Sequence, residues 1–168
     1  NQSQYYSTTY ARPDAASTEV LFIAPSDLPS FFENRSGDVR YNLLDTANEN
    51  GYLRTLKYSS DGKYKDNSAL LIRISEMYLI RAEALGRIQG LADLNTVRTN
   101  RGLNALTLSD VPDNATYAQA VADENRAEFN FEGHRYFDLA RTGQIVNVLQ
   151  PLTSVSISES NSCFPIPL

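Results

Sequence analysis

The sequence predicts a mainly α-helical fold with irregular loops and a few short strands in its N-terminal third. From Ala69 onward, apolar residues recur at intervals of three and four, as on one face of a helix. Residues 1–68 are instead polar and rich in turn formers. A chain of 168 residues, 42% of them hydrophobic, can bury one core. We therefore expect one domain, in which a loop-rich segment at 1–68 packs on a helical region at 69–168.

Two segments of the polar third are typical of extended strands. The run from Glu19 to Ala24 is mostly apolar and β-favouring, and Pro25 directly follows it. The second extended piece is expected from Gly51 to Tyr58, before the turn-forming sequence Ser60-Asp61-Gly62. Little else in residues 1–68 follows a helical period.

The next segment predicts two antiparallel helices with a tight joint. The first helix ends at Gly86 or Gly90, and the second ends at Gly102, because glycine favours the left-handed cap conformation. Such a pair is a helical hairpin of the tetratricopeptide type, which builds α–α superhelices. One hairpin buries its own face poorly, which suggests a longer helical array. The expected inward residues are Ile74, Met77, Tyr78, Ala82, Leu85 and Ile88, then Leu91, Leu94 and Val97.

Two further helices are expected after a loop from Leu103 to Asn114. Thr116 and Gln119 have the spacing of a capping box, which opens the third helix. Gly133 interrupts the helical pattern, and a short fourth helix from Tyr136 to Arg141 ends at Gly143. The expected inward side of the third helix is Ala118, Val121, Ala122, Asn125 and Phe129.

Glu124, Glu128 and Glu132 recur every fourth residue and would form one acidic stripe on this helix. Like charges at this spacing destabilise a helix unless cations pair with them. Arginine, which outnumbers lysine by twelve to three, forms ordered forked pairs with carboxylates. We predict a structural ion-pair network; the alternative is a carboxylate cluster for acid–base or metal chemistry. The predicted network comprises Arg73, Glu76, Arg98, Glu124, Arg126, Glu128, Glu132, Arg135, Asp138 and Arg141.

Several classes of function lack their residues in this sequence. The formal net charge of -5 argues against nucleic-acid binding. The chain has one histidine, His134, and one cysteine, Cys163, so the common zinc motifs are absent. No nucleophile elbow or glycine-rich phosphate loop is present. We expect no catalytic residue, no metal and no cofactor, although a glycosidase built on two carboxylates stays an alternative.

The aromatic residues of the polar third are the candidate ligand-binding residues. Tyrosine combines a flat apolar face with a polar rim, which suits stacking on a sugar ring. The alternative is that these rings pack the loops against the helices. The candidates are Tyr5, Tyr6, Tyr10, Phe31 and Tyr41.

Four segments, in order, resemble the SusD/RagB family. The segment Arg73–Ala84 has the arginine and glutamate that open a helix ending in Ala-Glu-Ala. Leu94–Gly102 has Leu-Asn and two arginines before glycine. The longest match is Glu124–Arg141, and the proline-rich end Phe164–Leu168 is similar to the segment that closes these proteins.

This resemblance implies a non-catalytic protein that binds nutrients at the bacterial surface. Family members bind glycans or oligosaccharides, sometimes peptides, and pass them to a SusC-like TonB-dependent transporter. They are held at the outer membrane by an N-terminal lipid anchor, which is absent from this chain. We therefore expect the C-terminal part of a longer lipoprotein. Two alternatives stay open: a helical-repeat scaffold for protein–protein contacts and a carboxylate glycosidase.

Overall fold

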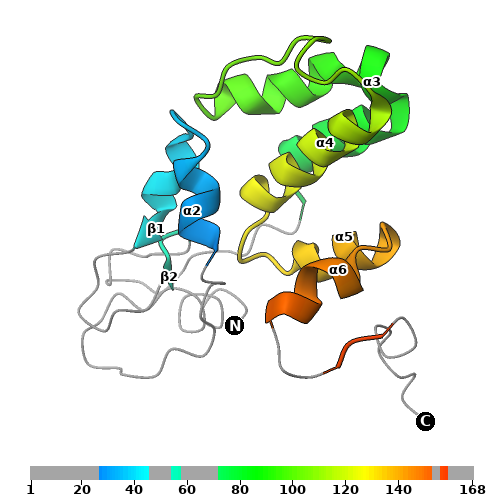
Figure 1. The fold of residues 1–168 in the computed structure, drawn as a ribbon. Helices are drawn as coiled ribbons and strands as arrows, with labels where there is room; N and C mark the ends of the chain where they lie inside the picture. The colour runs from blue at the N-terminus through cyan, green and yellow to red at the C-terminus, as the bar shows by residue number, and fades with distance from the viewer. Residues whose placement is uncertain (1–26, 46–53, 58–71, 153–155, 159–168) are drawn as a thin grey trace. The chain divides into compact units, whose positions relative to one another are not determined.

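The computed structural model describes residues 27–45, 54–57, 72–152 and 156–158, and most of them are helical (Figure 1). The predicted mainly helical class is confirmed. Contacts divide the chain into two units, one up to Phe131 and one from Glu132. The expected division into 1–68 and 69–168 stays a prediction. The strand expected from Glu19 to Ala24 lies outside the described residues.

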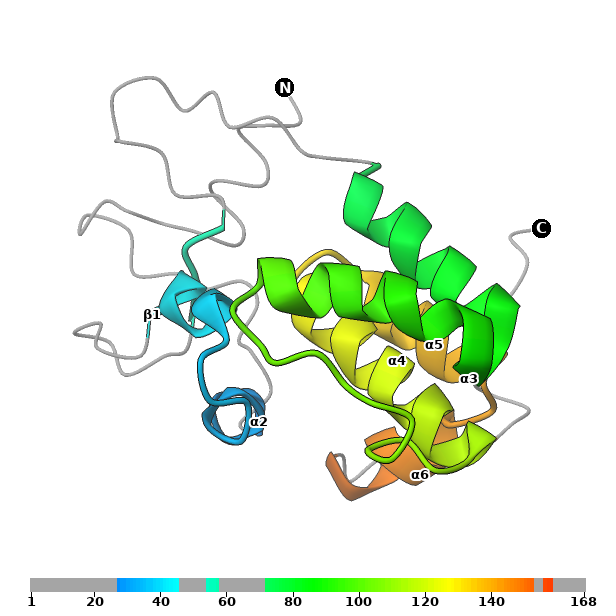
Figure 2. The same cartoon turned by 90° about the horizontal axis from the view of Figure 1, so that it is seen from above.

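Helix α3 (Ile74–Asn100) contains the predicted hairpin. Gly86 has non-helical angles, φ 71° and ψ -177°, and divides α3 into two helical halves (Figure 2). A residue with a side chain adopts positive φ only at a cost, which explains glycine at this joint. Beyond the second half, Gly102 also has positive φ, at 84°.

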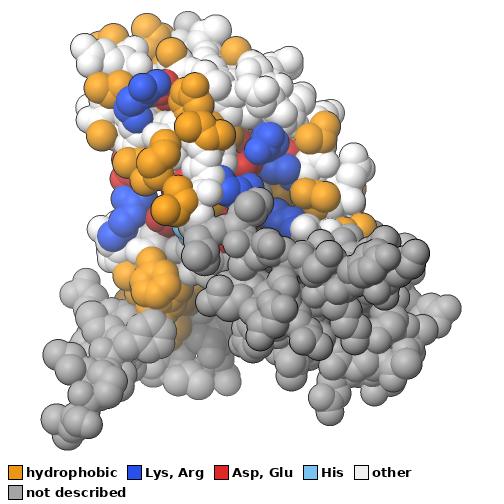
Figure 3. Space-filling model, turned by 180° about the vertical axis from the view of Figure 1, so that it is seen from behind, with side chains coloured by type: hydrophobic (Ala, Val, Ile, Leu, Met, Phe, Trp, Pro, Cys, Tyr) orange, Lys and Arg blue, Asp and Glu red, His pale blue; other side chains and the backbone are white. Residues whose placement is uncertain are grey.

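The face of α3 that is buried differs from the prediction in its first half. Ala82 is buried as predicted, and so is Leu79, which was not predicted, whereas Ile74, Met77, Leu85 and Ile88 are exposed. Apolar residues occur on both sides of this half-helix, so their spacing did not determine which side meets α4. Seen from behind, hydrophobic side chains lie at the surface of the described part (Figure 3). In the second half the prediction is confirmed, since Leu94 and Val97 are buried and Leu91 packs on them.

Helix α4 (Asn114–Glu128) packs against α3. The predicted capping box is wrong, because the cap is Asp113, whose carboxylate accepts the Thr116 N–H at 2.7 Å. Of the expected inward residues, Val121 is buried and Ala118 is exposed. The core of this unit consists of Leu79, Ala82, Leu94, Val97, Val111, Tyr117, Val121 and Phe129.

The described part of residues 27–57 holds four short elements. Helix α2 (Leu28–Glu33) and the 3-10 helix η1 (Val39–Leu43) were not expected from the sequence. Strand β1 (Leu44–Asp45) pairs antiparallel with β2 (Arg54–Thr55), which lies within the extended piece predicted from Gly51 to Tyr58. A second small core joins this segment to α4 through Leu28, Phe32, Leu44 and Ala127. The Val39 N–H donates to the Arg101 carbonyl at 3.0 Å, which also ties the segment to the end of α3.

The second unit begins with α5 (His134–Arg141), which is the predicted fourth helix starting two residues earlier. Helix α6 (Ile145–Leu149) and the 3-10 helix η2 (Gln150–Leu152) follow and were not expected. Among the helices of the described residues, none has the length and hydrophobicity that crossing a membrane requires.

Candidate functional site

Two glutamates of α4 lie at the centre of the first unit. Glu124 is 0% exposed and Glu128 is 1% exposed, although both side chains end in a carboxyl group. They are one helical turn apart, so their carboxylates lie on the same face of α4. Removing two carboxylates from water is costly unless cations and hydrogen-bond donors surround them.

Three arginines surround Glu124. Arg35, from the turn that follows α2, donates to it at 2.5 Å, and Arg40, from η1, donates to it at 2.7 Å. Arg98, from the second half of α3, approaches it at 3.4 Å. The carboxylate therefore joins two segments that are far apart in the sequence.

Glu128 is surrounded in the same way. Arg101 makes two hydrogen bonds to it, at 2.7 and 2.9 Å, and Arg73 lies at 3.2 Å. Arg40 contacts it at 2.9 Å and also bonds to Asp38. Arg40, itself 3% exposed, is thus the one described side chain that bridges all three carboxylates.

The C-terminal end of α4 is also held by cations. Lys57 donates to the Glu128 carbonyl at 2.7 Å and to the Asn130 carbonyl at 3.0 Å. Arg73 donates to the same Glu128 carbonyl at 2.9 Å. The last carbonyls of a helix lack partners within it and carry partial negative charge, so these cations stabilise the helix end.

The surrounding guanidinium groups fix the charge of this cluster. Burial by itself raises the pKa of Glu128, but hydrogen bonds and charge from Arg101, together with the charge of Arg40, lower that pKa to about 2. Burial likewise opposes the shift at Asp38, yet Arg40 and Arg35 hold the pKa of its carboxyl below the ordinary value. Both groups stay ionised at neutral pH, so neither can donate a proton as a general acid.

We predict a loss of stability in acid from these shifts. The pKa of Glu128 falls from an ordinary 4.5 to about 2 on folding, so its contribution is complete above pH 4.5 and is lost as pH falls to about 2. The loss is on the order of 3 kcal/mol. Urea unfolding between pH 6 and pH 2 measures it. Glu128→Gln should be less stable at pH 6 and should flatten the curve below pH 4.5; an unchanged slope would contradict this origin.

The structure corrects several members of the predicted network. Helix α4 ends at Glu128, so Glu132 does not extend the acidic stripe. Arg126 pairs with Asp27 at 2.7 Å, away from the buried glutamates. Glu76 forms no ion pair with any described residue. Arg141 and Asp138, both in the predicted network, pair with each other on α5 at 3.1 Å, and their part in a wider network stays a prediction. The role predicted for Arg135 stays a prediction.

Four members of the cluster were absent from the predicted network: Arg35, Asp38, Arg40 and Arg101. Arg40 contacts Glu124 across 84 residues of sequence, a distance that no local pattern reveals. Only a chemical indication of these partners was available from the sequence. A stripe of glutamates needs cations, and Arg35, Arg40 and Arg101 are three of the twelve arginines in the chain.

The two described aromatic candidates, Tyr41 and Phe31, contact different groups of the protein. Tyr41 packs on Phe32, with ring centroids 6.3 Å apart, in the small core beside α4. Phe31 lies beneath two guanidinium groups, with Arg126 at 4.5 Å and Arg35 at 5.3 Å from its ring centroid. In both, packing inside the protein engages the ring. Tyr5, Tyr6 and Tyr10 lie outside the described residues.

Within the described residues, no group of three or more His, Cys, Asp or Glu side chains is placed to hold a metal ion. The buried carboxylates bind guanidinium groups, an arrangement that stabilises the fold and leaves no free carboxylate pair across a cleft. The chemistry of the cluster is therefore that of a structural frame.

Comparison with known proteins identifies the family. The model of the SusD family matches residues 33–160, and the chain belongs to this family. SusD-like protein P38 of Formosa agariphila is 29% identical over 135 residues, which cover 71% of this chain and 27% of that protein. Starch-binding protein SusD of Bacteroides thetaiotaomicron is 31% identical over 128 residues, which cover 66% of this chain and 22% of that protein. The matches thus span about a quarter of these relatives. No solved structure matches the chain significantly.

Proposed function

We propose that this chain is part of a non-catalytic, cell-surface protein that binds glycans or oligosaccharides. Family membership supports this, and one relative carries the name starch-binding protein. The observation that best supports a non-catalytic role is that Glu124 and Glu128 each pair with several arginines. A glycosidase needs two carboxyl groups that face a substrate, whereas Glu124 and Glu128 are buried and bind arginines.

The proposal extends to a partner and a location. We infer that the protein sits at the outer surface of the outer membrane through a lipid anchor. There it delivers its ligand to a SusC-like TonB-dependent transporter. A rigid helical frame suits this role, because a binding surface held in one conformation loses less entropy when the ligand binds. A peptide ligand is the alternative to a glycan.

Calorimetric titration of the full-length protein tests the binding function. The panel consists of maltoheptaose, cellohexaose, laminarihexaose and xylohexaose, with hexaalanine for the peptide alternative. We expect at least one saccharide to bind, and chromatography of the same mixtures to show ligands of unchanged length. Shortened products that disappear in Glu128→Gln would establish an enzyme. Absence of binding to every saccharide would refute glycan recognition of these classes.

Purification from native outer membranes tests the partner. We expect the detergent-solubilised protein to copurify with a TonB-dependent transporter. We also expect intact cells to expose it to externally added protease. Protection from protease in intact cells would contradict the proposed location.

A further inference from the structure

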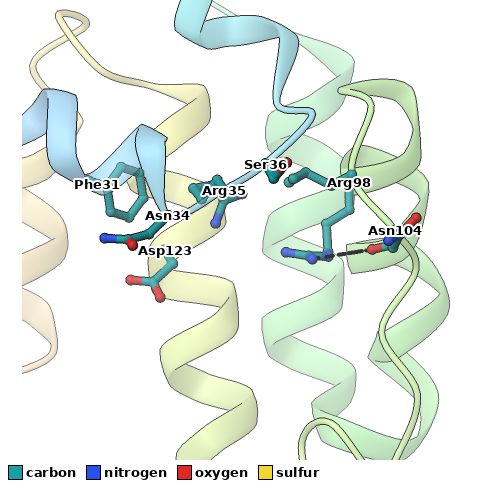
Figure 4. A pocket seen from close by; sticks show the side chains of 8 residues that line it. Phe31, Asn34, Arg35, Ser36, Arg98, Asn104 and Asp123 are labelled. Carbon is teal, nitrogen blue, oxygen red and sulfur yellow. Dashed lines mark hydrogen bonds between the residues drawn. The ribbon is translucent and has the colours of Figure 1, made fainter.

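A polar pocket lies next to the ion-pair cluster, in the first unit. It has a volume of about 430 Å³ and opens between α2, the turn that follows it, and the C-terminal end of α3. This size falls in the range of about 300–1,000 Å³ that is usual for small-molecule sites. Figure 4 shows Asn34 and Asp123 on one side of Arg35 and Asn104 beyond Arg98 on the other. The pocket is lined by Phe31, Asn34, Arg35, Ser36, Arg98, Leu103, Asn104 and Asp123.

Several polar groups that line this pocket have no partner among the described residues. Arg35 bonds to Asp38 through Nε and to Glu124 through Nη2, and its Nη1 group donates to no described residue. The side chains of Ser36 and Asn104 make no hydrogen bond to a described residue, and Asp123 accepts only from Gln119, through Oδ1. Hydrogen-bond donors and acceptors that have no partner among the described residues therefore line the same pocket.

The chemistry of these groups favours a neutral ligand rich in hydroxyl groups. Each sugar hydroxyl both donates and accepts, so it matches a surface that offers guanidinium, amide, hydroxyl and carboxylate groups together. An anion would meet the Asp123 carboxylate, and a cation would meet Arg35 and Arg98. Leu103 adds an apolar wall, while the faces of the Phe31 ring are already occupied by guanidinium groups.

The two arginines that line the pocket are held in place from behind. Arg35 and Arg98 both bond to the buried Glu124, and Arg98 also donates twice to the Asn104 carbonyl, at 3.2 and 3.3 Å. These contacts fix the turn of residues 34–36 relative to the loop of residues 103–104. A pocket formed before the ligand arrives loses little ordering entropy on binding.

We propose that this pocket is a subsite for one neutral sugar unit of the bound oligosaccharide. The inference rests on the proposed glycan-binding function and adds to it a location. Arg35 and Asn104 donate to sugar hydroxyls, Asp123 and Asn34 accept from them, and Leu103 contacts the apolar face of the ring.

The test compares variants of the full-length protein with whichever saccharide of the four-member panel binds most tightly. Asn104→Ala and Asp123→Ala each remove one ligand contact, and neither residue belongs to the buried ion-pair cluster. We expect each to raise the Kd about five- to tenfold, since one hydrogen bond is lost in each. Asn100→Ala is the matched control, because it removes the same amide from an exposed position nearby and should leave the Kd unchanged.

The possible outcomes separate this inference from the proposed function. If the saccharide binds the wild type and both pocket variants with the same Kd, the pocket is not a subsite and glycan binding stands. If the Asn100→Ala control weakens binding as much as the pocket variants do, the effect is not local and the subsite is refuted. If no saccharide binds the wild type, the proposed function and the subsite fall together. Thermal unfolding of each variant at the wild-type midpoint establishes that loss of binding is not loss of fold.

Discussion

Replacing Arg40 with alanine is expected to destabilise the protein by about 3–5 kcal/mol or more. Arg40 is 3% exposed and is the residue on which Asp38, Glu124 and Glu128 converge. Its removal leaves three carboxylates with fewer donors than acceptor positions, in a site closed to water. An uncompensated buried charge costs far more than the pair contributed in the intact fold. Urea unfolding of the full-length protein, followed by circular dichroism, measures the loss.

Arg81→Ala is the matched control. The Arg81 side chain is 62% exposed and pairs at 2.6 Å with Asp93, whose side chain is 10% exposed, so the same substitution removes a well-formed ion pair whose cation is solvated. Such pairs contribute less than about 1 kcal/mol. Arg40→Lys should recover only part of the stability, because one ammonium group cannot replace a planar fork that serves three carboxylates. Equal shifts in the unfolding midpoint for Arg40→Ala and Arg81→Ala would show that burial adds nothing to this cluster.

The two glutamates of the cluster could be predicted from sequence, whereas Asp38 and most of the arginines could not. Glu124 and Glu128 are conspicuous because like charges one turn apart are unfavourable alone. Arg35 and Arg40 reach them across 89 and 84 residues, and no periodicity connects positions so distant. The three-residue stripe was also one member too long, since the third glutamate follows the end of α4. The need to neutralise the glutamates thus predicts that cationic partners exist, but it does not predict where in the chain they lie.

The helices show a similar division between what local pattern determines and what packing determines. A joint at Gly86 or Gly90 was predictable, because glycine interrupts helices, and the structure has it at Gly86. The buried face of the first half of α3 was not, because isoleucines and leucines occur on more than one side of it. Only the position of α4 selects Leu79 and Ala82 over Ile74 and Ile88. Helix α2, six residues long, is shorter than two helical turns and leaves almost no period to detect.

Gly90→Ala is expected to destabilise the first unit by about 3 kcal/mol or more, because it combines overpacking with a lost buried hydrogen bond. A methyl group at Gly90 would overlap the carbonyl oxygen of Ala82, in the other half of α3. It would also lie 2.5 Å from the Tyr117 hydroxyl, which donates to that same carbonyl at 2.8 Å. The two halves of the hairpin and α4 therefore meet at a point where only a hydrogen atom fits. Thermal unfolding of the full-length protein measures the effect.

Gly86→Ala separates this steric effect from the general cost of replacing glycine. Gly86 has positive φ, but a methyl group there meets no atom within 4 Å. Its replacement should cost about 1–3 kcal/mol through backbone strain alone, because φ 71° with ψ -177° is a region that almost only glycine adopts. Gly90 has no positive φ, so any excess in Gly90→Ala comes from the contact with Ala82 and Tyr117. If Gly90→Ala were the milder of the two, the halves of α3 could not pack against each other and against Tyr117 as closely as the structure requires.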